Sequence, residues 1–172
     1  MTDILFHESV STSLGDFQVI SSQKGIFRIF LPTEKERFQN WIIDFESIGK
    51  INEIKEESKV SKQLKEYTKG ERQQFDCQLD LQGTQFQKEV WRTLIKIPYG
   101  TTRSYSWVAN QIKKPKSIRA VGLANGNNPI PIIIPCHRVI GKNGKLIGYG
   151  GGIPLKKKLL ELEFANKHFK GD

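Results

Sequence analysis

The chain has 172 residues, of which 37% are hydrophobic and 26% are charged, and this composition is typical of a folded, soluble protein of one domain or two small ones. No run of about 18 apolar residues occurs, which excludes a membrane-spanning helix, and the opening residues MTDILFHESV lack the basic and apolar regions of a signal peptide. The chain has two cysteines, Cys77 and Cys136, too few for a disulfide framework or most zinc sites. We therefore expect a reduced, cytoplasmic protein with no metal.

Charge is distributed unevenly along the chain, whose formal net charge is +9. Residues 1–80 hold 11 Lys+Arg against 14 Asp+Glu, a net of −3, whereas residues 81–172 hold 16 against 4, a net of +12. Between Glu89 and Glu161 there are 13 basic residues and no acidic one. Such a basic half suits a polyanion such as nucleic acid, although a basic solvated surface would give the same pattern.

The first half of the chain predicts a hairpin followed by a helix. Alternating apolar residues on both sides of a polar SSQKG turn predict a hairpin over 15–31. Thr33 and Glu36 have the spacing of a capping box. The apolar residues that follow recur at i, i+3, i+4 and i+7, as in an amphipathic helix. They are Phe38, Trp41, Ile42 and Phe45.

The rest of this half is less regular. Residues 46–58 are polar and lack a clear period, so we expect a linker there. Apolar residues over 60–67 fit one face of a short helix that ends at Gly70. Alternation of apolar and polar residues over 75–81 predicts a strand.

Composition and charge change near residue 82, where we place the boundary between a domain over 1–82 and a second over 83–172. The second domain opens with another capping box, Thr84 with Gln87, and with a helix that extends to about residue 97. Ser104 can then cap a short helix that reaches about Ile112.

A second short helix follows the basic turn at 113–116. Ser117 can cap it, and it reaches Asn125, with Gly126 just past its end. Two short helices joined by a tight turn are a candidate helix-turn-helix, the motif that many DNA-binding domains use.

The last third of the chain combines a buried segment, a hairpin and a helix. Residues 130–135 are apolar with two prolines, which predicts a buried extended passage. Asn143-Gly144 between apolar pairs predicts a hairpin over 139–147. A glycine loop at 148–152 precedes Pro154, which suits the first turn of a helix. The apolar stripe of that helix is Leu155, Leu159 and Leu162.

Cys136 is the strongest candidate for chemistry. His137 and Arg138 follow it, and neighbouring cations lower a thiol pKa and make the sulfur a nucleophile. In extended backbone His137 would point away from Cys136, so a water would relay the proton between them. Glu163 lies at the edge of the last apolar stripe and can turn inward to orient His137, provided that a partner compensates its burial. A buried structural cysteine is the alternative reading.

Cofactor signatures are missing from the sequence. The cysteines and histidines have no metal-ligand spacing. The glycine loop lacks the G-K-[ST] that a nucleotide P-loop requires. We therefore expect no metal and no cofactor.

The residues around Cys136 match a known family. Pro135-Cys136-His137-Arg138-Val139, preceded by Asn128-Pro129, resembles the active-site signature of the O6-alkylguanine-DNA alkyltransferases, also called methylated-DNA–protein-cysteine methyltransferases. The resemblance covers residues 83–163 in the family's order and spacing, and residues 1–82 match only loosely. The other matching motifs are Gly83-Thr84-Gln85-Phe86, Val90-Trp91, Ile97-Pro98-Tyr99-Gly100, Ser104-Tyr105, Arg119-Ala120-Val121-Gly122 and Gly148–Gly152.

The resemblance implies a fold and a reaction. The fold is α+β, with a small N-terminal α/β domain that is ribonuclease H-like, followed by a helical winged helix-turn-helix domain. The reaction is the irreversible transfer of an alkyl group from O6-alkylguanine in double-stranded DNA to Cys136, by a monomer that binds the minor groove and flips the nucleotide out. A thioether has no easy hydrolytic exit, so each molecule would act once. O4-alkylthymine stays open as a second substrate.

The resemblance also assigns roles to residues. Cys136 would be the acceptor, His137 its water-mediated base, Glu163 the residue that orients His137, and Asn128 the residue that orders the turn before Cys136. Tyr105 would bond guanine N3. The residues that would contact DNA or the flipped base are Arg119 (which fills the vacated stack), Tyr105, Ala120, Gly122, Val139, Tyr149 and Gly150. Asn125 stands where some relatives have a larger apolar residue, which leaves the accepted alkyl size open.

Two alternatives belong to other functional classes. A non-catalytic lesion-binding protein would keep the DNA-binding domain, but the relatives of that kind replace the cysteine that is present here as Cys136. A transcription regulator would need a regulatory domain or a metal-binding cysteine cluster, and the sequence has neither. DNA binding alone would not separate these readings from the transferase.

Overall fold

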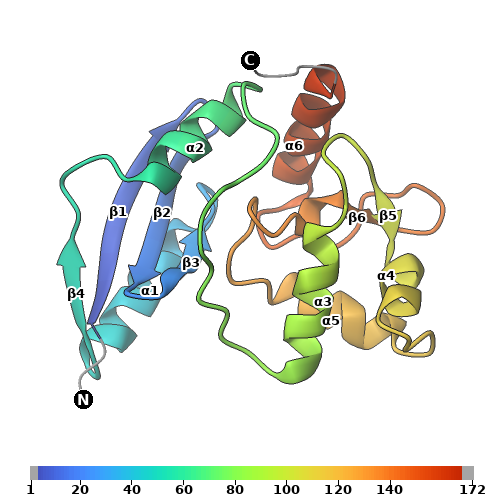
Figure 1. Ribbon diagram of the computed structural model, residues 1–172, viewed down its shortest axis with the longest axis horizontal. Coiled ribbons are helices and arrows are strands. Elements are labelled where there is room, and N and C mark those ends of the chain that lie inside the picture. Colours follow the sequence, from blue (N-terminus) through green and yellow to red (C-terminus); the bar gives the residue numbers. More distant parts are fainter. Residues whose placement is uncertain (1–3, 168–172) are drawn as a thin grey trace. The chain divides into compact units, whose positions relative to one another are not determined.

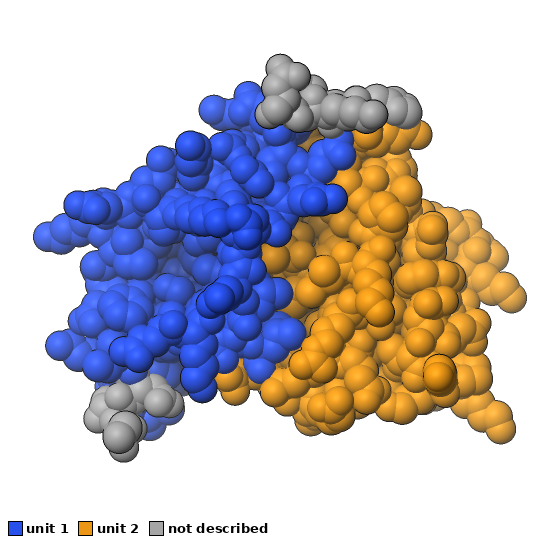
Figure 2. All heavy atoms as spheres, in the orientation of Figure 1, with its two compact units in different colours: residues 1–81 blue, residues 82–172 orange. Residues whose placement is uncertain are grey.

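The computed structural model describes residues 4–167. The chain divides into two compact units, unit 1 over residues 1–81 and unit 2 over residues 82–172 (Figure 2). Each unit has its own sheet and its own helices. We describe them separately.

Unit 1 is built on a four-stranded sheet of order β3-β2-β1-β4 (Figure 1). The strands are β1 (Ile4–Thr12), β2 (Gly15–Ser22), β3 (Gly25–Phe30) and β4 (Lys50–Glu53). β2 and β3 pair antiparallel, which confirms the predicted hairpin. β1 pairs antiparallel with β2 and parallel with β4. The sequence did not predict β1, and β4 lies inside the segment expected to be a linker.

Two helices cover opposite faces of this sheet, because successive side chains of a strand point to opposite sides. The rings of Phe38 in α1 (Lys35–Glu46) and His7 in β1 lie 5.0 Å apart. The next residue of β1, Glu8, hydrogen-bonds Ser58 at the start of α2 (Lys59–Thr68). The predicted helices are therefore confirmed. The core on the α1 side is aromatic, with Phe27, Phe38, Trp41 and Phe45 packed against Leu5, Ile20 and Phe30.

Two further predictions for unit 1 are wrong. The Thr33–Glu36 capping box does not form, because the cap residue is Glu34, whose near-helical backbone gives no side-chain cap bond. Residues 75–81 form no strand: Ile26 N–H donates to the Gln78 carbonyl and Asp80 N–H donates to the Ile26 carbonyl, which makes a single bridge at Leu79. The alternating pattern there reflects alternating burial without a ladder.

Unit 2 is mainly helical. Its helices are α3 (Gln85–Ile95), α4 (Tyr105–Gln111), α5 (Ile118–Gly126), the short 3₁₀ helix η1 (Cys136–Arg138) and α6 (Ile153–Asn166). The capping box of Thr84 with Gln87 and the cap of Ser104 on Trp107 N–H both form, as predicted. Trp91 of α3 donates from Nε1 to the Ala124 carbonyl of α5 at 2.8 Å and so ties these two helices together.

Four predictions for unit 2 need correction. Ser117 makes no side-chain cap bond, because its backbone (φ −95°, ψ 27°) is not extended as a capping residue requires, and Gly126 is the last residue of α5 instead of following it. Residues 130–135 are buried but not extended: they turn back on themselves, with Ile134 N–H donating to the Ile130 carbonyl at 2.9 Å.

The hairpin over 139–147 is also absent, although the Asn-Gly turn forms and Gly144 N–H donates to the Gly141 carbonyl. The short strand β6 (Val139–Ile140) pairs instead, in parallel, with β5 (Arg103–Ser104). Beyond the turn one bond, from Gly141 N–H to the Lys145 carbonyl at 2.9 Å, joins the two arms, and the carbonyls of Val139 and Ile147 accept from Lys156 Nζ.

Candidate active site

Cys136 is the first residue of η1, and a buried turn positions it. Asn128 fixes that turn from both sides: its Nδ2 donates to the Ile134 carbonyl at 2.7 Å, and its Oδ1 accepts from Ile130 N–H at 3.0 Å. Within the turn Ile132 has φ of 74°, a conformation that costs a β-branched residue about 1–3 kcal/mol. Strained backbone therefore lies four residues before Cys136, which is 4% exposed.

His137 is fully buried and is held by Glu163 of α6. Its Nε2 lies 2.7 Å from Glu163 Oε1. The expectation of extended backbone at this point is wrong, because Cys136 and His137 share the 3₁₀ turn. The predicted approach of Glu163 to His137 is present, although these two residues are 26 positions apart in the sequence.

Arg138 is the partner that compensates the burial of Glu163. Its Nε donates to Glu163 Oε2 at 2.9 Å, its Nη2 to Oε1 at 2.9 Å, and its Nη1 to the Ile97 carbonyl at 2.6 Å. Gly100 N–H donates to the same carboxylate at 3.1 Å. The sequence suggested Arg138 as a cation beside the thiol, whereas its guanidinium is committed to Glu163 and to the Ile97 carbonyl.

This network sets the charge states. Burial alone would raise the pKa of Glu163, but His137 and Arg138 together outweigh it and hold that pKa well below its usual value of 4.5. Burial lowers the pKa of His137 below 6.5, although Glu163 opposes the shift. At neutral pH the pair is therefore a carboxylate and a neutral imidazole. An ionised carboxylate has no proton to give, so His137 carries its proton on Nε2, and Nδ1 is the basic nitrogen.

Lys156 of α6 is a site residue that the sequence analysis missed. It is fully buried, and its Nζ donates to the carbonyls of Val139, Ile147 and Gly148 at 2.6, 2.8 and 3.3 Å. Burial lowers its pKa to about 8, while the Cys136 thiolate acts in the opposite direction. Lys156 therefore ties β6 to the loop before α6.

A shifted helical stripe would have revealed Lys156. The predicted stripe of α6 runs through Leu155, Leu159 and Leu162. Positions 156, 159, 160 and 163 follow i, i+3, i+4 and i+7, and all four are buried. A lysine and a glutamate on one buried face are a pair of polar residues that need partners inside the protein.

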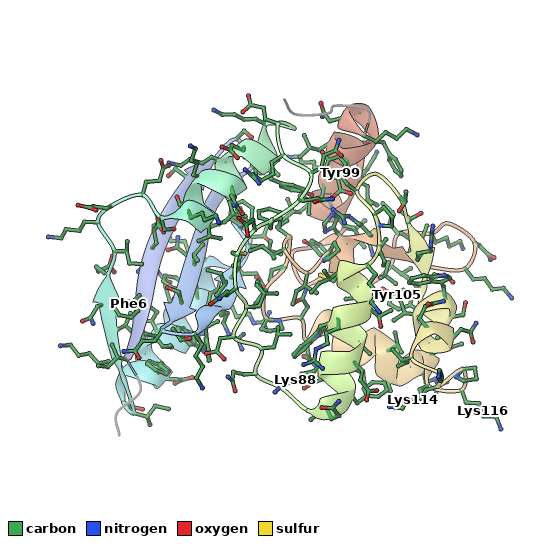
Figure 3. All side chains as sticks on the ribbon, viewed as in Figure 1. Phe6, Lys88, Tyr99, Tyr105, Lys114 and Lys116 are labelled. Carbon is green, nitrogen blue, oxygen red and sulfur yellow. The ribbon has the colours of Figure 1, made fainter. Side chains whose placement is uncertain are left out.

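Tyr105, at the start of α4, reaches the same loop. Its Oη donates to the Ile147 carbonyl at 3.2 Å, and burial, followed by the Cys136 thiolate, raises its pKa above 10. An added Cβ at Gly148, whose φ is +56°, would lie 3.4 Å from that hydroxyl. A Cβ added at Gly122 would lie 4.0 Å from its nearest neighbour, which is also an atom of Tyr105. Tyr105 is labelled in Figure 3.

The remaining predicted residues lie around this centre. Val139 is buried in β6, and its N–H donates to the Cys136 carbonyl. Tyr149 is half-buried and Gly150 is exposed, both in the loop before α6. Arg119 and Ala120 are exposed on α5, and no hydrogen bond links either to Cys136 in the described chain. Asn125 is buried beneath them; its Nδ2 lies 3.5 Å from the Cys136 carbonyl, and its Oδ1 has no hydrogen-bond partner within residues 4–167.

Residues 4–167 contain no group of three or more His, Cys, Asp or Glu side chains that could hold a metal ion. Across the same residues, no helix combines the length and the apolar character that a membrane crossing requires.

Two family models match the chain. Residues 5–81 match the ribonuclease-like domain of 6-O-methylguanine DNA methyltransferase, and residues 85–165 match the DNA binding domain of 6-O-methylguanine DNA methyltransferase. The two matches therefore cover both units.

Individual proteins agree with the family models. A methylated-DNA–protein-cysteine methyltransferase of Mycobacterium bovis is 63% identical over 101 residues, 59% of this chain and 61% of that protein. One from Methanosarcina barkeri is 40% identical over 165 residues, 94% of this chain and 99% of that protein. The matched stretch thus spans under two thirds of the mycobacterial relative and nearly all of the archaeal one.

Solved structures give the same result. The crystal structure of the Mycobacterium tuberculosis O6-methylguanine methyltransferase superimposes with a TM-score of 0.83 at 40% identity, covering 98% of this chain and 96% of that one. The crystal structure of Mycobacterium tuberculosis OGT in complex with DNA gives a TM-score of 0.80 at 41% identity, covering 95% and 94%.

Proposed function

The chain belongs to the family of the methylated-DNA–protein-cysteine methyltransferases, and from that premise we propose that it repairs DNA by moving an alkyl group from O6 of guanine to Sγ of Cys136. The observation that carries this proposal is the buried 2.7 Å contact between His137 Nε2 and Glu163. It fixes a neutral imidazole whose basic nitrogen is Nδ1, beside a cysteine on the same 3₁₀ turn. A general base needs such an orienting partner.

The reaction then follows from these groups. The thiol proton passes through a water to His137 Nδ1, and the Glu163 carboxylate, which Arg138 holds in place, stabilises the imidazolium that forms. The thiolate attacks the alkyl carbon, so that a bond from sulfur to carbon forms while the bond from carbon to O6 breaks and its electron pair stays on guanine. Tyr105 donates a hydrogen bond to N3 and stabilises that charge. The thiol proton finally resides on guanine, and the products are a thioether at Cys136 and an unmodified base.

The sulfur of Cys136 cannot reach O6 inside a duplex, so the nucleotide has to leave the stack. We assign Arg119 to the space that it vacates. Arg119 is exposed on α5, which follows a tight turn after α4, and the small residues Ala120 and Gly122 permit close approach to a minor groove. Val139, Tyr149 and Gly150 would line the site of the flipped base.

The same proposal extends to organisation. We infer that residues 83–172 form a winged helix-turn-helix domain that binds DNA and reacts, that residues 1–82 form a ribonuclease H-like scaffold, and that the protein acts as a monomer. The thioether has no second nucleophile to release it, so each molecule reacts once.

Intact mass spectrometry tests the proposal. The protein is incubated with an excess of duplex DNA that carries O6-methylguanine, and its peptides are then mapped. We expect one methyl increment per chain, on Cys136 and not on Cys77. The Cys136→Ser variant should bind the lesion but show no increase in mass. If the unaltered protein binds the lesion tightly but gains no methyl group, the result would favour a non-catalytic lesion-binding protein instead.

A further inference from the structure

The exposed face of α5 carries a large apolar side chain. Val121, Ala124 and Asn125 point into unit 2, and the opposite side of the helix faces solvent. On that side Leu123 is 70% exposed. A single exposed leucine needs no explanation. Leu123, however, lies one helical turn after Arg119 and three residues after Ala120, so the three share one face.

Apart from Arg119, the neighbours of Leu123 on this face of α5 are small. Ala120 precedes it by three residues and Gly126 follows it by three, and a Cβ added at Gly126 would meet nothing within 4 Å. The side chain of Leu123 therefore projects beyond its small neighbours, and an approaching partner would contact Leu123 and Arg119 first.

The charges around α5 indicate a polyanionic partner. The turn before the helix carries Lys113, Lys114 and Lys116, all exposed, and the last two are labelled in Figure 3. Of the three, Lys114 is paired with Glu89, at 2.6 Å. No acidic residue occurs between Glu89 and Glu161 in the sequence. An apolar side chain framed by cations fits the minor groove of DNA, whose rims are phosphates and whose walls are deoxyribose.

We propose that Leu123 is a second groove contact, an apolar wedge that enters the minor groove beside the flipped nucleotide and holds α5 there. The inference rests on the proposed function, because it assigns DNA to the same helix. Residues four apart on a helix are separated by about 6 Å along its axis. Successive nucleotides of one strand are about 3.4 Å apart along the duplex. With α5 along the groove, Leu123 thus contacts the duplex about two steps from the position that Arg119 fills.

Leu123→Ala tests the proposal without loss of the fold, because the side chain is exposed and alanine is the better helix former. The measurements are the rate constant for alkyl transfer from a duplex that carries O6-methylguanine and the rate constant for free O6-benzylguanine, which needs no groove. We expect the rate on the duplex to fall about tenfold, because the variant loses most of the apolar area that Leu123 buries against DNA. The rate on the free base should stay unchanged. Leu123→Met should retain the duplex rate within about twofold.

Ile43→Ala is the matched control. Ile43 is 67% exposed on α1 of unit 1, so it loses a similar exposed side chain from a different helix, and both rates should stay unchanged. Salt dependence gives a second test. An apolar contact releases no counterions, so Leu123→Ala should leave the slope of log affinity against log salt unchanged, whereas Lys116→Ala should reduce its magnitude by about 0.9 if Lys116 contacts a phosphate.

Outcomes separate this inference from the proposed function. An unchanged duplex rate in Leu123→Ala, with an active unaltered protein, would overturn the wedge alone. Equal slowing on the duplex and on the free base would also overturn it, because the effect would then lie at Cys136. A change of oligomeric state without DNA would assign Leu123 to a contact between copies. Absence of transfer from both substrates by the unaltered protein would refute the proposed function itself.

Discussion

Unit 1 buries its polar side chains beside partners that reach the surface, whereas unit 2 buries a charged network completely. His7 of unit 1 bonds Glu53, whose side chain is 69% exposed, and Gln18. In unit 2, Glu163 and His137 are fully buried, and Arg138 completes the network. Buried charges have a desolvation cost that apolar residues of similar size avoid. Unit 2 accepts this cost around Cys136, where the proposed reaction needs a neutral, oriented histidine, and the contrast supports the assignment of that reaction to unit 2.

Removing the central charge of unit 2 should have the largest effect. Glu163→Gln leaves Arg138 buried without its anion, so we expect a loss of about 3–5 kcal/mol in the free energy of unfolding. It also replaces the carboxylate that stabilises the His137 imidazolium with a neutral amide, so the transfer rate should fall about 100-fold. Denaturant titration and single-turnover kinetics measure the two effects. Glu161→Gln is the control, because that side chain is 63% exposed and lies 3.7 Å from Lys157, and both quantities should be nearly unchanged.

The same network predicts acid sensitivity. The pKa of Glu163 is lowered in the folded protein, so its stabilising contribution is present above about pH 4.5 and is lost as pH falls toward the folded value. The pKa of His137 is also lowered, so the unfolded chain takes up a proton first as pH falls below 6.5, and this too favours unfolding. The free energy of unfolding should therefore decline from about pH 6.5 downward. A stability that is constant between pH 7 and pH 4 would contradict both assignments.

The third prediction separates DNA engagement from chemistry within unit 2. Arg119→Ala removes the side chain that we place in the vacated stack, so transfer from duplex DNA should slow about 10- to 100-fold while transfer from free O6-benzylguanine stays unchanged. Single-turnover rates on the two substrates measure this ratio. Equal losses on both substrates would place Arg119 at the reacting centre, together with Glu163.

Much of this site could be predicted because its parts lie near one another in sequence or on one helix face. Cys136 and His137 are adjacent, and helical spacing turns Glu163 inward. The use of Arg138 was not predicted, because its place beside Cys136 suggested a cation for the thiol, and nothing in the sequence indicated its bond to the Ile97 carbonyl or its pairing with Glu163. Lys156 was missed because a lysine is normally exposed. Two predictions of the fold failed for one reason: β4 was not predicted, and the predicted 139–147 hairpin does not form. β4 pairs with β1 and β6 pairs with β5, and a local sequence pattern does not record pairing with distant strands.

Lys156 gives a fourth prediction, in which rising pH changes stability and the transfer rate in opposite directions. Its pKa is lowered to about 8 from 10.5, so between these values the unfolded chain holds a proton that the folded protein has lost, and stability rises with pH in this window. The neutral amine has two N–H groups and cannot donate to three carbonyls, so it holds β6 and the loop before α6 less firmly. The rate of alkyl transfer should therefore fall about tenfold above pH 8. Lys156→Met should be slow at pH 7 and show no such alkaline decline. Lys157→Met, at a side chain that is 66% exposed, should behave as the unaltered protein.

The smallest expected effect lies in unit 1 and closes the comparison. Glu53→Gln weakens the hydrogen bond with His7, but Glu53 is largely exposed and His7 keeps its bond to Gln18, so the free energy of unfolding should change by at most about 1 kcal/mol. The transfer rate should stay unchanged, since no residue of the proposed reaction lies in unit 1. Denaturant titration and transfer kinetics, run beside Glu163→Gln, measure both quantities. A transfer rate that fell with Glu53→Gln would show that unit 1 takes part in the reaction and is more than a scaffold.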